Sequence, residues 1–313
     1  MPLSMEKKLR VLAVAATASL ACAAEASPIF NNLVVFGDSL SDNGNYYALT
    51  GGASPPSPPY FQGRWSNGPV WVEHLAGSLG VPLIDRAVAG ATTRDVYDDQ
   101  IVPFTTPGSI PPDALYVVWA GVNDFLSLPP NPFAAVDAAI ANLDRSVRRL
   151  ASAGATEILV PNLVDLGRTP GAIELGNPFL IGLARTIADE FNGELAHSAS
   201  RWRGELGVNV IELDVFGLLE QAIANPSAFG LTNVTQRALR ANGTVVPNPA
   251  DYLFWDEIHP TAAVHALYAD RAYASVPEPT TLLTFTTLML LSSACAIPFP
   301  RRRVQPPGHC HVE

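Results

Sequence analysis

The sequence predicts an α/β protein in which helices cover both faces of a mainly parallel sheet. Short, wholly apolar runs such as Leu115 to Trp119 are typical of strands that are buried on both faces. These runs alternate along the chain with longer segments of helical periodicity, which is the order that strand–helix–strand units require. Because no internal repeat and no linker interrupts the alternation, we expect a single folded domain.

The first half of this domain begins with a short strand over Leu33 to Phe36. Residues 50–63 are rich in glycine, serine and proline, and they predict a loop. A helix is expected to start near Pro69, because proline suits the first helical turn, and to end at Gly77–Gly80. The run Leu115 to Trp119 then supplies the second buried strand.

The second half contains the clearest helix, which starts at Asn131-Pro132 and ends at Gly154. Its apolar side chains Phe133, Val136, Ile140, Leu143, Val147 and Leu150 follow helical spacing. Asn177-Pro178 opens a long helix that we expect to end near Gly204. The remaining predicted elements are strands over 158–160 and 208–212 and a closing helix over 262–274.

The composition excludes several classes of protein. The chain has 313 residues, and 48% of them are hydrophobic, which excludes an intrinsically disordered protein. Acidic residues outnumber basic ones 29 to 19, and the net charge of −10 argues against a nucleic-acid partner, which needs a cationic surface. Three cysteines are too few for a disulfide framework or a four-ligand zinc site.

Residues 1–26 have the pattern of a secretory signal peptide. Lys7, Lys8 and Arg10 precede an apolar run over 11–24, and Ala24-Glu25-Ala26 forms a cleavage site. An uncleaved membrane anchor is the alternative, but the apolar run is shorter than the ~20 residues that span a bilayer. We therefore expect an exported protein that functions outside the cell or at its surface.

The C-terminal segment carries a second signal, which starts with Val276-Pro277-Glu278-Pro279. The stretch from Thr280 to Pro298 has no charged residue and is long enough to cross a bilayer, and three arginines follow at 301–303. The pattern resembles a PEP-CTERM sorting tail, which implies a bacterium with an exosortase-type enzyme and a link to extracellular polysaccharide. A permanent anchor is the alternative. The expected division is therefore 1–26, 27–275 and 276–313.

The candidate chemistry lies at the two ends of the central domain. Ser39 follows the first strand, where parallel sheets bind ligands, and a helix beginning after it would point N–H groups at an oxyanion. An ordinary helix-capping turn is the alternative. Near the other end, Asp256 and His259 stand three residues apart, which allows the carboxylate to orient the imidazole.

Together these segments resemble the GDSL lipase/esterase family, also called SGNH hydrolases. Four blocks occur in the family's order and span nearly the whole of residues 27–275. They are Gly37-Asp38-Ser39-Leu40-Ser41-Asp42-Asn43-Gly44-Asn45, Ala89-Gly90, Gly121-Val122-Asn123-Asp124 and Asp256-x-x-His259-Pro260. The resemblance implies a flavodoxin-like α/β/α sandwich of three layers.

The resemblance also implies a role for each site residue. Ser39 is expected to be the nucleophile, His259 the general base and acid, and Asp256 the group that orients His259. The oxyanion would be bound by the backbone N–H groups of Ser39 and Gly90 and by the side chain of Asn123. No metal and no organic cofactor is implied.

The implied activity is hydrolysis of carboxylic esters through an acyl-enzyme on Ser39. The sequence leaves the substrate open between small-molecule or lipid esters and acetyl groups on an extracellular polysaccharide. Two further functions stay open, namely acyl transfer to an alcohol and a catalytically idle matrix-binding protein. Residues 50–63 and 217–250 are the loops expected to shape the pocket.

Three other polar residues in the sequence suggest lesser roles. Ser78 lies in a small-x-Ser-x-Gly segment, but we expect it at the end of a helix instead of in a nucleophile turn. His265 could line the rim of the site, and Asp124 is expected to support the turn that contains Asn123.

Overall fold

The computed structural model describes residues 30–106 and 110–276, which lie within one compact unit, Pro28–Pro277. The predicted signal peptide and, apart from Val276, the predicted sorting segment lie outside the described residues. In the described part of the chain, no helix combines the length and apolar character that crossing a membrane requires.

Five strands form the central sheet, and every neighbouring pair in it is parallel. Their spatial order is β2, β1, β3, β4, β5, which is the order of the flavodoxin-like doubly wound fold. The strands are β1 (Asn32–Gly37), β2 (Leu83–Asp85), β3 (Ala114–Trp119), β4 (Glu157–Pro161) and β5 (Asn209–Leu213). The predicted α/β class with a mainly parallel sheet is confirmed.

The strands that the sequence predicted are those buried on both faces. All six residues of β3 are buried, and Leu33 to Phe36 of β1 have no exposed surface. The strand β2 was not predicted. It has three residues, all only half-buried, at the edge of the sheet, so it contains no apolar run that marks a strand.

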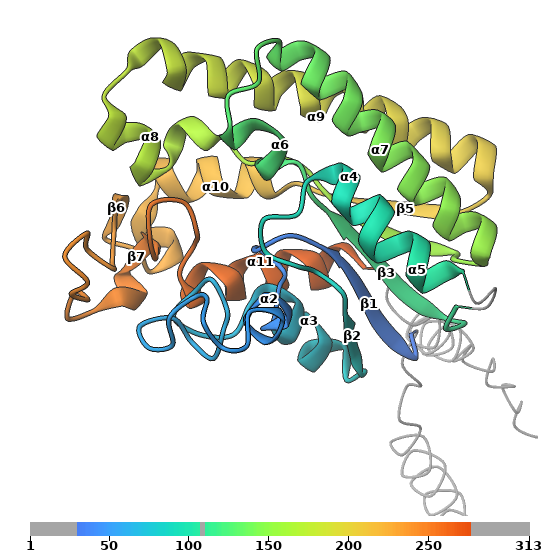
Figure 1. The fold of residues 1–313 in the computed structure, drawn as a ribbon, viewed down its shortest axis with the longest axis horizontal. Helices are drawn as coiled ribbons and strands as arrows, with labels where there is room; N and C mark the ends of the chain where they lie inside the picture. Colours follow the sequence, from blue (N-terminus) through green and yellow to red (C-terminus); the bar gives the residue numbers. More distant parts are fainter. Residues whose placement is uncertain (1–29, 107–109, 277–313) are drawn as a thin grey trace, which may run out of the picture. The chain divides into compact units, whose positions relative to one another are not determined.

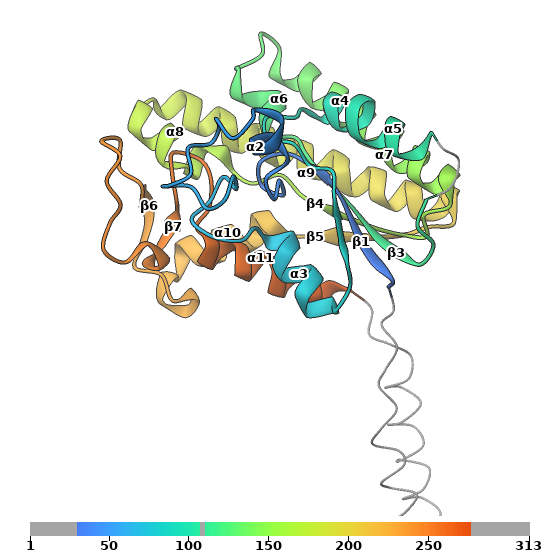
Figure 2. The same ribbon diagram turned by 60° about the horizontal axis from the view of Figure 1, so that its bottom comes forward.

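Helices cover both faces of the sheet, as Figures 1 and 2 show. One layer contains α3 (Trp71–Leu79) and α11 (Ala262–Ser275), which pack on each other, and the opposite layer contains α7 (Pro132–Ala153) and α9 (Pro178–Leu206). The other α-helices are α2 (Asn45–Leu49), α4 (Thr93–Asp95), α5 (Val102–Thr105), α6 (Val122–Leu126), α8 (Pro170–Leu175) and α10 (Val215–Ala224).

The long helices start and end where their sequence signals indicate. The side chain of Asn131 accepts a hydrogen bond from the N–H of Ala134 at 3.2 Å and caps α7, and Gly154 ends this helix with φ +111°. The prediction for α9 was slightly wrong at its end. Gly204 continues the helix, and Gly207 ends it instead, with φ +67°.

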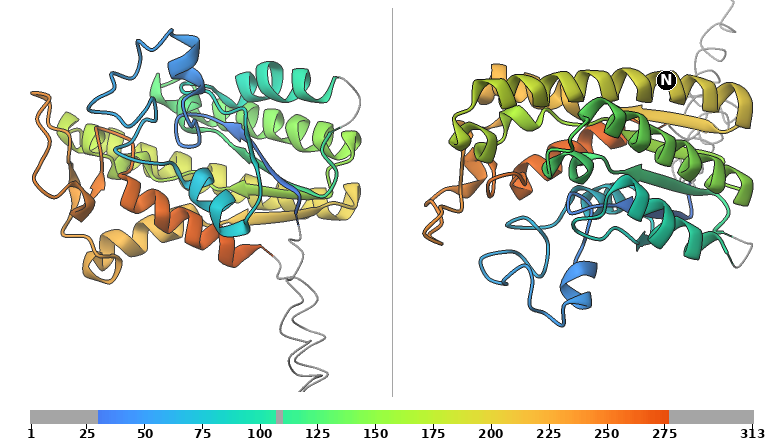
Figure 3. Two further views of the ribbon diagram at one scale, coloured as in Figure 1. Left: turned by 90° about the horizontal axis from the view of Figure 1, so that it is seen from below. Right: turned by 45° about the horizontal axis from the view of Figure 1, so that its top comes forward.

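Shorter segments connect these layers. A π-helix, Val96–Ile101, joins α4 to α5, and 3₁₀ turns occur at Leu166–Arg168, Pro226–Phe229 and Pro249–Asp251. A separate pair of strands, β6 (Asn233–Arg237) and β7 (Tyr252–Phe254), runs parallel. Figure 3 shows this pair at the same end of the fold as the segment between α2 and α3, where β1 also ends.

Candidate active site

Ser39 lies in a tight turn directly after β1. The backbone oxygen of Asp38 accepts hydrogen bonds from the N–H groups of Ser41 and Asp42, each at 3.0 Å, and the Asp38 side chain accepts one from Leu40 at 3.0 Å. The next helix, α2, starts only at Asn45, so no helix N-terminus directly follows Ser39. The turn itself fixes the position of the hydroxyl.

The end of β1 is held from the other side by Gln100 on the π-helix. Its side-chain amide accepts a hydrogen bond from the N–H of Gly37 at 2.9 Å and donates one to the oxygen of Gly37 at 2.8 Å. Gly37 also approaches β3 closely, because a Cβ there would lie 2.6 Å from the oxygen of Trp119. The strand end that precedes Ser39 is therefore fixed on both flanks.

Ser39, His259 and Asp256 form a continuous chain of hydrogen bonds. Ser39 Oγ lies 2.9 Å from His259 Nε2, although the two residues are 220 positions apart. His259 Nδ1 lies 2.8 Å from Oδ2 and 3.0 Å from Oδ1 of Asp256. Because a carboxylate can only accept, Nδ1 carries the proton and Nε2 is free to accept the hydrogen of Ser39.

The carboxylate of Asp256 is well supplied with donors. Its Oδ1 accepts hydrogen bonds from the N–H groups of Ile258 at 2.9 Å and His259 at 2.7 Å. The hydroxyl of Tyr60 donates to Oδ2 at 2.8 Å. Trp65 covers the imidazole, with 5.1 Å between the two ring centroids. Sequence analysis assigned no role to Tyr60 or Trp65, because the contact that each makes with the Asp256–His259 pair is long-range.

Burial and charge oppose each other in the Asp256–His259 pair. Burial favours a raised pKa for Asp256, but the charge and hydrogen bond of His259, with the backbone donors, outweigh it and hold the pKa below its ordinary value. Burial favours a lowered pKa for His259, but the adjacent carboxylate of Asp256 outweighs it and raises the pKa. The pair is therefore set to stabilise an imidazolium.

Gly90 and Asn123 lie beside the same cavity as Ser39 and His259. The cavity has a volume of about 250 Å³. Gly90 is in the loop between β2 and α4 with φ +85°, a conformation that favours glycine, and Asn123 is in α6 directly after β3. Serine after β1 and asparagine after β3 therefore meet at the carboxyl ends of adjacent strands, where the strand order reverses.

The loop that contains Gly90 is held by the motif around Ser39. Asp42 Oδ2 accepts a hydrogen bond from the N–H of Ala89 at 2.8 Å, and Asn45 donates to the oxygen of Ala87 at 2.9 Å. These bonds explain why the first sequence block extends past the serine. Its later residues join the nucleophile turn to the glycine loop.

Asn123 has acceptors within the protein as well as the cavity beside it. Its Nδ2 donates to the oxygen of Ala91 at 3.0 Å and to Asp38 Oδ2 at 3.3 Å. Asp38 is 1% exposed, and burial raises its pKa to about 7, partly opposed by the hydrogen bond from Leu40. The side chain of Asn123 is thereby oriented before any substrate binds.

Several predicted positions have other roles. His265 is not on the rim, because it is 1% exposed and its Nδ1 accepts a hydrogen bond from the N–H of Trp71 at 3.3 Å. Ser78 lies within α3, as expected from its sequence context. Asp124 accepts hydrogen bonds from the N–H and hydroxyl of Thr93, at 2.9 Å and 2.7 Å, so it supports the turn.

The predicted pocket loops are only partly present at the cavity. Residues 50–63 contribute Ser54 to its lining, but the segment 217–250 contributes none of the lining residues. That segment instead contains most of α10 and the strand β6. Val122, Leu126, Val164, Leu166 and Ile258 form much of the apolar wall, together with Leu40, Ala89 and the rings of Tyr46 and Trp65. In residues 30–106 and 110–276, no cluster of three or more His, Cys, Asp or Glu side chains could hold a metal ion.

Comparisons with known proteins identify the family of this chain. Residues 33–272 match the GDSL-like lipase/acylhydrolase family. The phosphatidylcholine-sterol acyltransferase of Aeromonas hydrophila is 30% identical over 80% of this chain and 91% of its own length. Esterase EstA of Pseudomonas aeruginosa is 31% identical over 86% of this chain, which spans half the length of that relative.

A solved structure of Axe2, an acetylxylan esterase from Geobacillus stearothermophilus, is 17% identical, covers 80% of this chain and 96% of its own, and superposes with a TM-score of 0.48. This structural likeness is too loose to carry an inference about substrate. The family match, by contrast, spans most of the chain, including Ser39, Gly90, Asn123, Asp256 and His259. The chain therefore belongs to the GDSL-like lipase/acylhydrolase family and is a serine ester hydrolase.

Proposed function

We propose that this hydrolase cleaves carboxylic esters through an acyl-enzyme on Ser39. The observation that supports the proposal is the hydrogen-bonded chain from Ser39 Oγ through His259 to Asp256, with links of 2.9 Å and 2.8 Å. His259 Nε2 takes the proton of Ser39 as Oγ forms a bond to the acyl carbon. His259 then gives that proton to the leaving alcohol, and the ester C–O bond breaks.

Water completes the reaction in a second step of the same kind. His259 takes a proton from water, the hydroxide oxygen bonds to the acyl carbon, and the bond from that carbon to Ser39 Oγ breaks. Ser39 recovers its proton from His259, and the carboxylic acid leaves. Asp256 stabilises the imidazolium in both steps and is not itself protonated.

The oxyanion of each tetrahedral intermediate needs donors that are already in place. We assign this role to the N–H groups of Ser39 and Gly90 and the Nδ2 of Asn123, since all three residues line the cavity that contains the reactive hydroxyl. Nδ2 would exchange its longer hydrogen bond, 3.3 Å to Asp38, for one to the oxyanion. Such donors stabilise the charge that develops in the transition state and leave the substrate itself largely unaffected.

Hydrolysis of p-nitrophenyl acetate and butyrate by the wild type and by Ser39→Ala tests the proposal. The expected result is a loss on the order of 10⁴-fold or more in kcat for the variant, because the nucleophile is gone. Equal, background-level rates for both proteins would support the alternative of an idle matrix-binding protein. Thermal unfolding of the variant should match that of the wild type, which excludes misfolding as the cause.

Acyl transfer is the second candidate function. It is favoured by the 30% identity to an acyltransferase over 91% of that protein's length. In this reaction an alcohol replaces water in the second step, and a new ester forms. Product analysis with added glycerol distinguishes the two, because transfer yields acylglycerol and hydrolysis yields only the free acid.

The location and natural substrate of the enzyme are also proposals. The signal pattern of residues 1–26 and the PEP-CTERM-like pattern of residues 276–313 support export, membrane retention at the surface and removal of the tail by an exosortase-type enzyme. The same tail favours acylated extracellular polysaccharide as one substrate.

Fractionation of cells expressing the full chain and a variant lacking residues 276–313 tests retention. Recovery of both proteins in the same fraction, with residues 276–313 still attached to the full chain, would contradict it.

A further inference from the structure

The catalytic cavity adjoins a second cavity of about 370 Å³. Leu126, Leu166 and Ile258 line both of them, so the two cavities are direct neighbours. Ile258 directly precedes His259 in the chain, and Leu126 lies in the same short helix as Asn123. The shared wall is therefore built by the segments that also contain the proposed catalytic groups.

The second cavity is almost entirely apolar. Twelve of its fifteen lining residues have aliphatic or aromatic side chains, and the others are Thr169, Gly171 and Glu257. The carboxylate of Glu257 is paired with Arg237 at 3.3 Å, and its side chain is 61% exposed, so its charge is solvated and compensated. A lining of this kind favours a hydrocarbon ligand over a sugar, whose hydroxyls would lack partners.

The mouth of this cavity is apolar as well. Leu126, Leu128 and Leu175 line it, and their exposed fractions are 50%, 57% and 72%. Phe179, which lies at the start of α9 and close to Leu175 in the sequence, is 74% exposed. Large aliphatic side chains that stay exposed around a cavity mark a ligand or lipid site, because their exposure to water is unfavourable.

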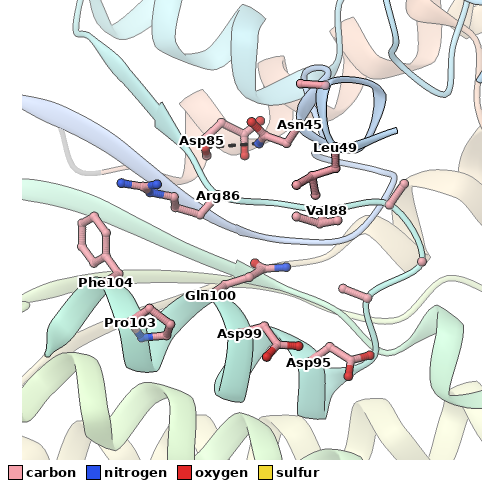
Figure 4. A pocket seen from close by; sticks show the side chains of 14 residues that line it. Asn45, Leu49, Asp85, Arg86, Val88, Asp95, Asp99, Gln100, Pro103 and Phe104 are labelled. Carbon is pink, nitrogen blue, oxygen red and sulfur yellow. Dashed lines mark hydrogen bonds between the residues drawn. The ribbon is translucent and has the colours of Figure 1, made fainter. Parts of the chain in front are cut away.

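A contrasting cleft lies on the other side of the catalytic cavity. Its volume is about 850 Å³, and it shares Ala89 and Gly90 with the catalytic cavity. Figure 4 shows the polar side chains of Asp85, Arg86, Asp95, Asp99 and Gln100 around it. Half of its fourteen lining residues are apolar, among them Leu49, Val88 and Phe104, so this cleft has a mixed lining that suits a polar alcohol better than the second cavity does.

We propose that the second cavity binds the acyl chain of the substrate and makes this enzyme selective for medium-length fatty acyl esters. The inference rests on the proposed acyl-enzyme at Ser39. A water molecule occupies ~30 Å³ in the liquid and a methylene is of comparable size, so 370 Å³ accommodates roughly a dozen methylenes. The cavity therefore fits chains of about eight to twelve carbons.

The structure also explains how the cavity keeps its place beside the catalytic loop. The N–H of Gly171 in α8 donates to the oxygen of Glu257 at 2.9 Å, two residues before His259. A Cβ at Gly171 would lie 3.2 Å from that same oxygen, so glycine permits the close approach. The helix α8, which forms one wall, is thereby attached to the loop that positions His259.

The test measures kcat/KM for p-nitrophenyl esters from acetate to dodecanoate at monomeric substrate concentrations. For the wild type, kcat/KM should rise by up to about fourfold per added methylene until the cavity is filled. Ala184→Phe and Ala172→Phe place a ring in the cavity from two different helices. Each should lower kcat/KM for decanoate by at least ~10-fold and leave acetate within about twofold. Ala196→Phe, the same change on an exposed face of α9, is the matched control.

Three results would overturn the inference. One is a wild-type rate that is flat or falls as the acyl chain lengthens. The second is a cavity variant that slows hydrolysis of the acetate and decanoate esters equally. The third is a cavity variant whose effect depends on the length of the alcohol in a series of alkyl acetates and not on the length of the acyl chain. Failure of the proposed function is distinguishable, because Ser39→Ala would then hydrolyse every ester as fast as the wild type.

A measurement on the unmodified enzyme keeps the inference testable if both variants fail to fold. Decanoate should inhibit hydrolysis of p-nitrophenyl acetate by the wild type competitively, at a concentration at least ~100-fold lower than acetate requires, since the cavity binds the chain of the acid product. Equal inhibition by the two acids would contradict an acyl site.

Discussion

Tyr60 donates its hydroxyl hydrogen to Oδ2 of Asp256 at 2.8 Å, across 196 residues of sequence. Asp256 is 2% exposed, so Tyr60 donates to a buried carboxylate. The same carboxylate accepts hydrogen bonds from the ring of His259 and from two backbone N–H groups. The loop over 50–63 therefore contributes to the electrostatics of the proposed triad as well as to the cavity. A hydrogen bond to a buried charge is among the stronger ones in proteins.

Replacing Tyr60 by phenylalanine should alter both stability and pH dependence. Loss of a hydrogen bond to a charged group is expected to lower the free energy of unfolding by about 1.5–3 kcal/mol. Without this donor the carboxylate becomes more basic and holds a proton on His259 more strongly. The acid limb of kcat/KM should therefore move to higher pH.

Tyr116→Phe is the matched control for this variant. The hydroxyl of Tyr116 also donates a hydrogen bond, to the oxygen of Pro111 at 2.6 Å. Tyr116 and Pro111 do not line the catalytic cavity. It should lose stability with no change in the pH profile. An unchanged acid limb in Tyr60→Phe would show that the tyrosine does not act on the Asp256–His259 pair.

The pH dependence of the wild type should reflect the raised pKa of His259. The imidazole acts as a base only when neutral, so kcat/KM rises as pH increases through that pKa. Burial lowers the pKa but the Asp256 carboxylate raises it more, so the midpoint should lie above the ordinary ~6.5. A profile with its midpoint at or below that value would contradict the assignment.

Replacing Asp256 by asparagine removes the charge and leaves the burial. The largest contribution that raises the pKa of His259 is then gone, while burial and the weaker effects of Asp38 and Glu257 remain, so the pKa falls and the acid limb moves to lower pH. The rate at the plateau should fall by about 10⁴-fold, because asparagine no longer holds the imidazole in the required tautomer and no longer stabilises its cation. Steady-state kinetics between pH 5 and pH 9 measure both effects, and a plateau within tenfold of the wild type would argue against the triad.

Replacing Asn123 by alanine should lower kcat by about 10²–10³-fold with little change in KM. The reason is that the amide binds the oxyanion of the transition state and only weakly the uncharged ester. Asn142→Ala removes an asparagine whose Nδ2 contacts Thr93 at 3.2 Å and which does not line the cavity, so its kcat should stay near that of the wild type. Equal losses in the two variants would remove the case for Asn123 as an oxyanion donor.

Replacing Gln100 by leucine should destabilise the protein and disturb the nucleophile turn. The change leaves the buried N–H of Gly37 without its partner, at a cost of about 1–3 kcal/mol in the free energy of unfolding, whereas the oxygen of Gly37 still accepts a hydrogen bond from the N–H of Val88 at 3.1 Å. Because Gly37 precedes Ser39 by only two residues, kcat should also fall. Chemical denaturation checks the first effect, and Gln221→Leu at an exposed position provides the comparison.

The order of elements could be predicted from the chain, with a few informative misses. Strands β1 and β3 were predictable because parallel strands buried on both faces must be continuously apolar. The ends of α7 were predictable because capping chemistry is local. The edge strand β2 was not, since its formation depends on pairing with β1 and not on its own three residues.

The sequence by itself determined the fold class, the family and the residue types available for catalysis, because apolar periodicity, caps and short motifs are written in neighbouring residues. Only the tertiary structure decided which distant groups meet. It brought Tyr60 to Asp256, Gln100 to Gly37 and an apolar cavity to the wall beside Ile258. These contacts depend on how layers pack around the sheet. The residues next to a side chain in the sequence do not indicate which distant residue it will contact in the folded protein.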